Sequence, residues 1–177
     1  MEFEDLVRER AMMRAFRPDP VPEELIQKLL RSAVRAPSAG NLQAWEFIIV
    51  QEPERKRRLA EAALGQMFVA EAPVVIVTCR NMERNARRYG DRGRHFYSPI
   101  DASFASLMIL LAAHNEGLGA CFVGAYRDEE VSRILGLPEH ARPVGIMPIG
   151  WPAESATVTE RMPLAEVVHY ERFGQRR

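Results

Sequence analysis

The sequence predicts a single globular domain that combines helices with strands. The chain has 177 residues, and 47% of them are apolar, which is enough for one sizeable core. Several stretches repeat apolar residues at helical spacing, and some of these begin at a proline or at acidic residues. Short β-branched runs, bounded by glycine and proline, alternate with these stretches and indicate buried strands.

The first expected helix covers residues 2–14 and carries arginines in its C-terminal half. At helical spacing, Arg10 and Arg14 would point the same way. Their charges then either complement the helix dipole or bind one anion together. The intervening Met12 and Met13 are expected in the core.

A second helix is expected from Pro22 to the residues before Pro37, since proline disfavours helical conformation in the preceding residue. Residues 38–43 then form a loop of small residues with two amide side chains, and residues 45–50 form a buried strand. Held between a helix and a strand, this loop suits a flat polar ligand. An ordinary helix-to-strand connection is the alternative interpretation.

A third helix is expected to begin at Pro53, and a second strand covers residues 73–79. Residues 80–97 carry six arginines and two glycines. This composition favours a mobile, solvated loop. A lid, or a landing site for a phosphorylated co-substrate, is the functional alternative.

The next helix, residues 98–116, is apolar almost all round, which is typical of a core helix or of one buried between subunits. In so short a chain, a dimer interface is favoured. Strands at 120–124 and 142–150 flank a short helix at 129–135. The tail, residues 157–173, is apolar enough to need a surface on which to lie.

Composition argues against several classes of function. Lys+Arg and Asp+Glu both number 24, so nucleic acid is not expected as a partner. The acidic N-terminus does not resemble a signal peptide, and no apolar run is expected to reach transmembrane length, which predicts a cytoplasmic protein without a membrane partner. Cys79 and Cys121 lie in apolar runs and are expected to be buried and reduced.

Common catalytic motifs are also missing from the sequence. It holds no phosphate-binding P-loop, no GxSxG nucleophile motif and no HExxH metal motif, and its four histidines are isolated. No metal site is expected. Several arginines that could bind an anion, without an obvious nucleophile, favour a bound cofactor as the source of the chemistry.

Seven motifs, in order along nearly the whole chain, resemble those of the FMN-dependent nitroreductase family. Residues 10–16 resemble its Arg-Arg-Ser-x-Arg-x-Phe, and residues 36–45 resemble its Ala-Pro-Ser-x-x-Asn-x-Gln-Pro-Trp loop. The other five motifs lie at residues 20–22, 101–103, 117–119, 149–152 and 161–164. Each motif is short, so the ordered set carries the resemblance.

The resemblance implies an α+β fold in which helices wrap a central mixed sheet. One domain, residues 1–177, would be completed by homodimerisation, with the tail from about 157 to 177 packing on the partner subunit. Two FMN molecules would lie at the interface. NAD(P)H would reduce the flavin, and a nitroaromatic, a quinone or a related small acceptor would then be reduced in the same pocket by a ping-pong mechanism.

The resemblance also implies a role for particular residues, none of them a catalytic side chain. The expected phosphate ligands are Arg10, Arg14 and Arg161. The expected contacts to the ribityl chain or ring edge are Asn41 and Gln43. Residues expected to close over the flavin from the partner are Pro37, Ser38 and Ala39. Backbone near the flavin N5 is expected at Val123 and Gly124, and Gly150 would let backbone approach the phosphate. Met12 replaces the usual serine and its hydroxyl contact.

Alternative functions remain open at this point. The same fold could carry out reductive dehalogenation, flavin cleavage or enone reduction. A flavin-binding regulatory protein without turnover is a second class, and a nucleic-acid module that uses the arginines of residues 80–97 is a third. Those arginines are also a candidate site for the extra phosphate of NADPH.

Overall fold

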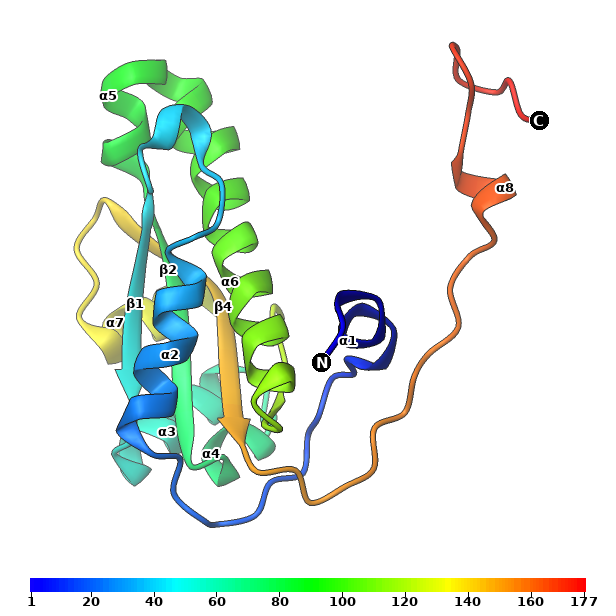
Figure 1. The fold of residues 1–177 in the computed structure, drawn as a ribbon. Helices are drawn as coiled ribbons and strands as arrows, with labels where there is room; N and C mark the ends of the chain where they lie inside the picture. Colours follow the sequence, from blue (N-terminus) through cyan, green and yellow to red (C-terminus); the bar gives the residue numbers. More distant parts are fainter.

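The computed structural model describes all 177 residues as an α+β domain built on a four-stranded sheet of order β1-β2-β4-β3 (Figure 1). The strands are β1 (Trp45–Val50), β2 (Val74–Asn81), β3 (Gly119–Ala120) and β4 (Ala141–Gly150). The predicted α+β class is confirmed. All three strand pairings are antiparallel, so this chain alone does not form the mixed sheet that the resemblance implied. The sheet would be mixed only if a further strand paired in parallel with one of these four, and this chain contributes no such strand.

Helices cover both faces of the sheet, because β2 is apolar on both. Val74 and Ile76 pack with α2 (Glu23–Ala33) and α6 (Ser98–Asn115). The alternate residues Val75 and Val77 face the other way, as strand geometry requires. They pack with α3 (Pro53–Ala62), α4 (Phe68–Glu71) and α7 (Asp128–Leu135). The short helix α4 was not predicted.

Helix α6 is a core helix on one side and leaves apolar side chains exposed on another. Ala102, Ala105 and Ile109 are fully buried against the sheet and α2. Phe104 and Leu107 are 43% and 47% exposed, so part of the apolar surface has no cover within this chain. The helical stretch Met82–Asn115 is long and apolar enough to cross a membrane by length and composition, so the expectation that no run is long enough was wrong. Its buried residues belong to the domain core.

The N-terminal helix is shorter than predicted. Helix α1 (Phe3–Glu9) ends where Arg10 leaves the helical region at φ −55° and ψ 124°. The following residues are extended, because their backbone bonds to the sheet instead: Met13 N–H donates to the Ala120 carbonyl at 3.0 Å, and Phe16 bridges Pro152. The predicted helix over residues 2–14 was therefore wrong beyond Glu9.

Residues 80 and 81 end strand β2 and residues 82–97 are helical, so the predicted mobile loop was wrong. Helix α5 (Met82–Arg92) and the π-helical turn η2 (Gly93–Tyr97) run directly into α6. The Asn81 side chain accepts the Arg84 N–H at 3.0 Å and so caps α5. A Cβ on Gly93 would lie 2.4 Å from the Asn85 carbonyl oxygen, so this glycine permits close packing rather than a loop.

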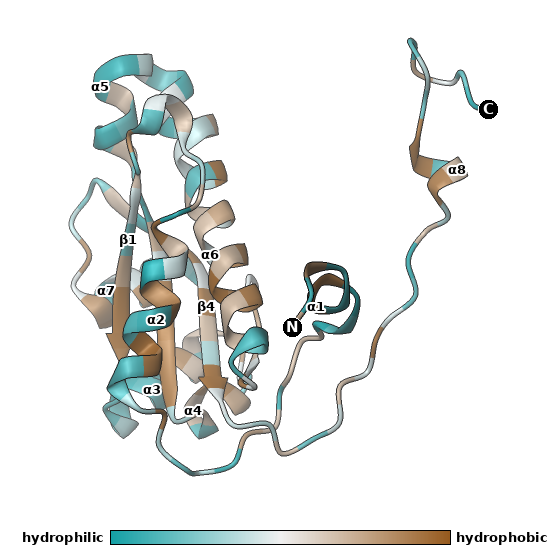
Figure 2. Ribbon diagram, in the orientation of Figure 1, coloured by the Kyte–Doolittle hydropathy of each residue, from teal (hydrophilic) through white to brown (hydrophobic).

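The C-terminal tail leaves the body of the domain (Figure 1), although it contains the short helix α8 (Leu164–Val167). Figure 2 shows apolar stretches along this tail. Met162 is 63% exposed, Leu164 is 76% exposed and Phe173 is 92% exposed. The surface that this apolar tail was expected to need is not supplied by its own chain.

Candidate functional site

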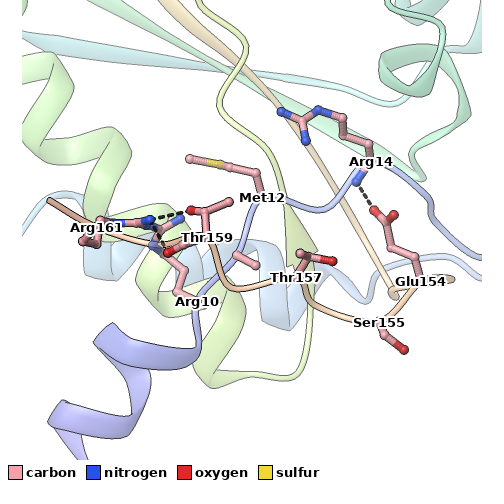
Figure 3. Close-up of a pocket in the computed structure, with 9 residues that line it drawn as sticks. Arg10, Met12, Arg14, Glu154, Ser155, Thr157, Thr159 and Arg161 are labelled. Atoms are coloured by element: carbon pink, nitrogen blue, oxygen red, sulfur yellow. Dashed lines mark hydrogen bonds between the residues drawn. The ribbon is translucent and has the colours of Figure 1, made fainter.

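A cavity of about 420 Å³ opens where the N-terminal arm passes the segment after β4 (Figure 3). We call it the arginine cavity. Its lining residues are Arg10, Ala11, Met12, Arg14, Glu154, Ser155, Thr157, Thr159 and Arg161. In an extended chain alternate side chains point the same way, so Arg10, Met12 and Arg14 all reach it. The helical spacing expected for the two arginines was wrong, but the structure still brings them together with Arg161.

The arginine cavity carries an excess of positive charge. Its one carboxylate, Glu154, accepts the backbone N–H groups of Arg14 and Ala15 through Oε1, at 2.5 and 3.0 Å. None of the three cavity arginines forms an ion pair. Arg161 donates only from Nη1, to Thr159 and the Glu160 carbonyl, so its other nitrogens stay free. Free guanidinium groups beside threonine hydroxyls are suited to a phosphate dianion.

Met12 lines the arginine cavity instead of the core. Its side chain is 36% exposed, whereas Met13 is only 7% exposed. The core position expected for Met13 is therefore confirmed, and the one expected for Met12 was wrong, because successive residues of an extended arm face opposite ways. The Met12 sulfur accepts a weak hydrogen bond from the Phe122 N–H at 3.4 Å.

Of the two residues after β3 whose backbone was expected near the flavin, only Gly124 has a free N–H. Val123 exchanges both backbone hydrogen bonds with Ile146, at 2.9 and 3.0 Å, so its N–H is not free for a flavin. The N–H of Gly124 makes no hydrogen bond within the chain, and the residue is exposed. Gly124 is therefore the available donor.

Gly150 is a glycine for a local packing reason. A Cβ at this position would lie 2.5 Å from Cδ of Pro73 and 3.3 Å from Cβ of Phe16. The expected close approach to a phosphate is therefore not needed to explain the residue.

We expect Gly150→Ala to lower the free energy of unfolding by about 1–3 kcal/mol, because the proline ring cannot move aside freely. Urea unfolding followed by circular dichroism measures this change. Gly124→Ala is the matched control, since a Cβ there meets only the Phe122 ring edge at 3.4 Å. Equal stability of both variants would contradict the packing explanation.

The loop of residues 37–43 is compact and strained. Gly40, Asn41 and Gln43 have φ values of +57°, +55° and +52°. Positive φ is costly for a residue with a side chain. Hydrogen bonds hold the loop in this shape: the Ser38 hydroxyl accepts the Gln43 N–H at 3.0 Å, and Gln43 Nε2 donates to the Asn41 carbonyl at 3.3 Å. The short 3-10 turn η1 (Ala39–Asn41) lies within this loop.

Asp101 of α6 connects the 37–43 loop to α5 through hydrogen bonds. The carboxylate is 2% exposed, and its two oxygens accept the Ala39 N–H at 2.9 Å and Asn85 Nδ2 at 2.8 Å. The sequence indicated Asp101 only as an acid in the first turn of a helix. An acid at the start of an apolar helix was the available signal for a buried role, but its partners come from distant segments.

The structure brings the three expected phosphate ligands together in the arginine cavity, and Asn41 and Gln43 together in the 37–43 loop. Within one chain it does not bring the cavity and the loop together. The 37–43 loop enters β1 at Trp45, which is paired with Arg80 at the end of β2. The arginine cavity follows Gly150, beyond the pairing of Ile149 with Val74 at the start of β2. At about 3.3 Å per residue, these two ends of β2 lie roughly 20 Å apart. Within one chain, Asn41 and Gln43 therefore do not line the arginine cavity.

Neither cysteine supplies a thiolate. Cys79 and Cys121 are free and buried, as predicted. Burial raises the pKa of the Cys79 thiol to about 12. Burial also raises the pKa of Cys121. Both thiols are therefore protonated at neutral pH and do not act as nucleophiles.

Comparison with known proteins identifies close relatives along most of the chain. A model of the nitroreductase family matches residues 7–71 and 65–151. A protein named NADH dehydrogenase from Thermus thermophilus is 36% identical, over 90% of this chain and 91% of its own. FMN reductase (NADPH) from Bacillus subtilis is 30% identical, over 97% and 74%. The structure of the Vibrio harveyi NADPH:FMN oxidoreductase complexed with NAD+ superposes with a TM-score of 0.89 and 26% identity, over 97% and 78% of the two chains.

Proposed function

The chain belongs to the nitroreductase family, and we propose that it is an NAD(P)H-dependent oxidoreductase that binds FMN. The observation that supports this best is the arginine cavity, where three guanidinium groups without ion pairs surround a space of about 420 Å³. Relatives named FMN reductase and NADPH-flavin oxidoreductase support the same cofactor and co-substrate. When bound, FMN supplies the redox chemistry that links NAD(P)H to a small electron acceptor.

The residues of this chain would hold the cofactor rather than react. Arg10, Arg14 and Arg161 fit the phosphate, because each can donate charge-assisted hydrogen bonds. The free N–H of Gly124 is a donor for the ring system. The amides of Asn41 and Gln43 suit the polar edge of the ring or the ribityl hydroxyls. Nitroaromatics and quinones are the acceptors we propose.

Three observations favour a homodimer with its sites between the subunits. The 37–43 loop lies roughly 20 Å from the arginine cavity of its own chain, by the strand spacing of β2. Helix α6 exposes Phe104 and Leu107, and the apolar tail has no surface of its own. A second copy would cover α6, receive the tail of residues 157–177 and bring its Pro37, Ser38 and Ala39 over the flavin. Each chain would remain one domain.

We expect sedimentation equilibrium to give about twice the chain mass of 20.1 kDa for the flavin-loaded protein. The physical reason is that two halves of a site at opposite ends of one sheet can only meet between copies. A monomer that binds one FMN tightly would contradict the shared site.

Two buried, reduced cysteines also favour a cytoplasmic location.

The decisive experiment is a visible absorption spectrum of the purified protein, repeated anaerobically after addition of NADH or NADPH. We expect flavin bands that bleach with a reduced nucleotide and return when an acceptor is added. Turnover with a nitroaromatic or a quinone would eliminate a purely regulatory role. Preferential turnover of a halogenated aromatic or an enone would instead favour the alternative reactions. A colourless protein that does not bind added FMN would overturn the proposal.

A further inference from the structure

Helix α5 presents Arg84, Arg87 and Arg88 on one face, since residues three and four apart are neighbours on a helix. Arg84 is already occupied, because it pairs with Glu46 and donates to the Gln43 carbonyl at 2.5 Å. Arg87 and Arg88 are exposed, and neither has an ion-pair partner within the chain. Helix α5 therefore carries two uncompensated cations at successive positions, whose side chains diverge around the helix.

The other arginines of this region are engaged elsewhere. Arg94 forms an ion pair with Glu83 at 2.5 Å, and a second with Asp91 at 3.2 Å. Arg92 stacks over the Phe96 ring, with its guanidinium carbon 4.5 Å from the ring centroid. Arg88 also stacks, with its guanidinium carbon 5.4 Å from the Tyr89 ring centroid, so stacking does not separate it from Arg92. Arg88 differs from Arg92 in lying against the 37–43 loop, and Arg87 has neither an ion pair nor an aromatic partner.

Arg88 lies directly against the 37–43 loop. A Cβ on Gly40 would be 2.9 Å from Nη1 of Arg88 and 2.5 Å from the Tyr89 hydroxyl. The absence of a side chain at Gly40 therefore makes room for this guanidinium. Arg87 lines a separate polar cavity of about 410 Å³ beside Arg84 and His140. Arg88 therefore borders the loop that would close over the flavin, whereas Arg87 lies on the neighbouring side of α5.

With the 37–43 loop over the flavin, as proposed above, Arg88 would lie beside the site that a dinucleotide co-substrate enters. NADPH differs from NADH by one phosphate monoester on the adenosine ribose. A side chain that makes an enzyme prefer NADPH must therefore bind that phosphate and little else of the nucleotide. Exposed arginines without carboxylate partners are suited to this, because guanidinium binds phosphate oxygens in a fork.

We propose that Arg88, assisted by Arg87, binds the additional phosphate of NADPH and gives this enzyme a preference for NADPH over NADH. The inference rests on the proposed function, because it requires the 37–43 loop to lie at a flavin site. It assigns a specificity role to α5, which is distinct from the phosphate contacts of the arginine cavity.

The test compares kcat/KM for NADPH and NADH in the wild type, Arg88→Gln and Arg87→Gln, with one acceptor held saturating. Glutamine keeps the length and polarity of the side chain and removes the charge. For Arg88→Gln we expect kcat/KM with NADPH to fall roughly 10- to 100-fold, as for a lost charge-assisted contact, with NADH turnover and the flavin spectrum unchanged. Arg87→Gln should show a smaller loss of the same kind.

Arg55→Gln, on the exposed side of α3, is the matched control and should alter neither co-substrate. Adenosine 2′,5′-bisphosphate should inhibit the wild type more strongly than adenosine 5′-phosphate, and Arg88→Gln should abolish that difference. A wild-type preference for NADH, or an equal loss for both nucleotides, would overturn the inference while leaving the flavoenzyme intact. Failure of the wild-type flavin to bleach with either nucleotide would instead remove the proposed function itself.

Discussion

Replacing Arg10 or Arg161 with alanine is expected to weaken FMN binding by about 1.5–3 kcal/mol, or roughly 10- to 150-fold in Kd. Each residue contributes a guanidinium without an ion pair to the arginine cavity. Arg161 is already in place, because Nη1 is held by the Thr159 carbonyl at 2.7 Å while Nε and Nη2 stay free. A phosphate dianion would therefore lose a charge-assisted contact in either variant.

Titration of the apoprotein with FMN, followed by quenching of flavin fluorescence, measures the effect. Arg8→Ala is a suitable control, since Arg8 is an exposed arginine of α1 that is paired with Asp5 and Glu9. Its removal should leave flavin affinity unchanged. Unchanged affinity in both Arg10→Ala and Arg161→Ala would show that the arginine cavity does not hold the phosphate.

The sequence was most informative where a segment's environment is the same along its length. Strand β2 (Val74–Asn81) was predicted within two residues, because residues 74–79 are buried on both faces and begin with four apolar β-branched residues. Helix α6 was predicted almost to the residue from its proline at the start and its glycines after the end. In both cases local preference and tertiary packing favour the same structure.

Elsewhere, contacts between distant segments decided the outcome. Residues 11–14 have a helical pattern, but the backbone bond from Met13 to Ala120 makes the arm extended. Gly90 and Gly93 suggested a loop, whereas Gly93 allows a helix to pack against the Asn85 carbonyl. A single sequence does not reveal such partners, because they depend on which segments the fold brings together.

In the candidate site too, some features were predicted from the sequence and others depend on contacts between distant segments. The family resemblance grouped Arg10, Arg14 and Arg161, and all three line the arginine cavity, even though the helical spacing expected for the first two was wrong. It also assigned a backbone donor to Val123, whose N–H is occupied by Ile146. The role of Asp101 could not be predicted, since its hydrogen-bond partners lie 62 and 16 positions away along the chain.

Asp101→Ala is expected to lower the free energy of unfolding by about 2–5 kcal/mol, because two buried donors would lose their acceptor at once. These donors are the Ala39 N–H and Asn85 Nδ2. Urea unfolding provides the measurement. Asp91→Ala is the control, since the Asp91 side chain is 88% exposed and its removal should cost no more than about 0.5 kcal/mol. Equal stability of the two variants would show that the buried carboxylate is dispensable.

The same variant should also reduce the fraction of folded protein that retains FMN, although Asp101 itself would not touch the flavin. The left-handed conformations at Asn41 and Gln43 are costly, so the loop keeps them only while its neighbours hold it in place. Asp101→Asn retains one acceptor oxygen and should fall between the wild type and alanine in both stability and flavin retention. If Asp101→Ala lowered stability but left flavin affinity intact, the 37–43 loop would be held by Arg84 and Ser38 alone, and its contribution to the site would not depend on α6.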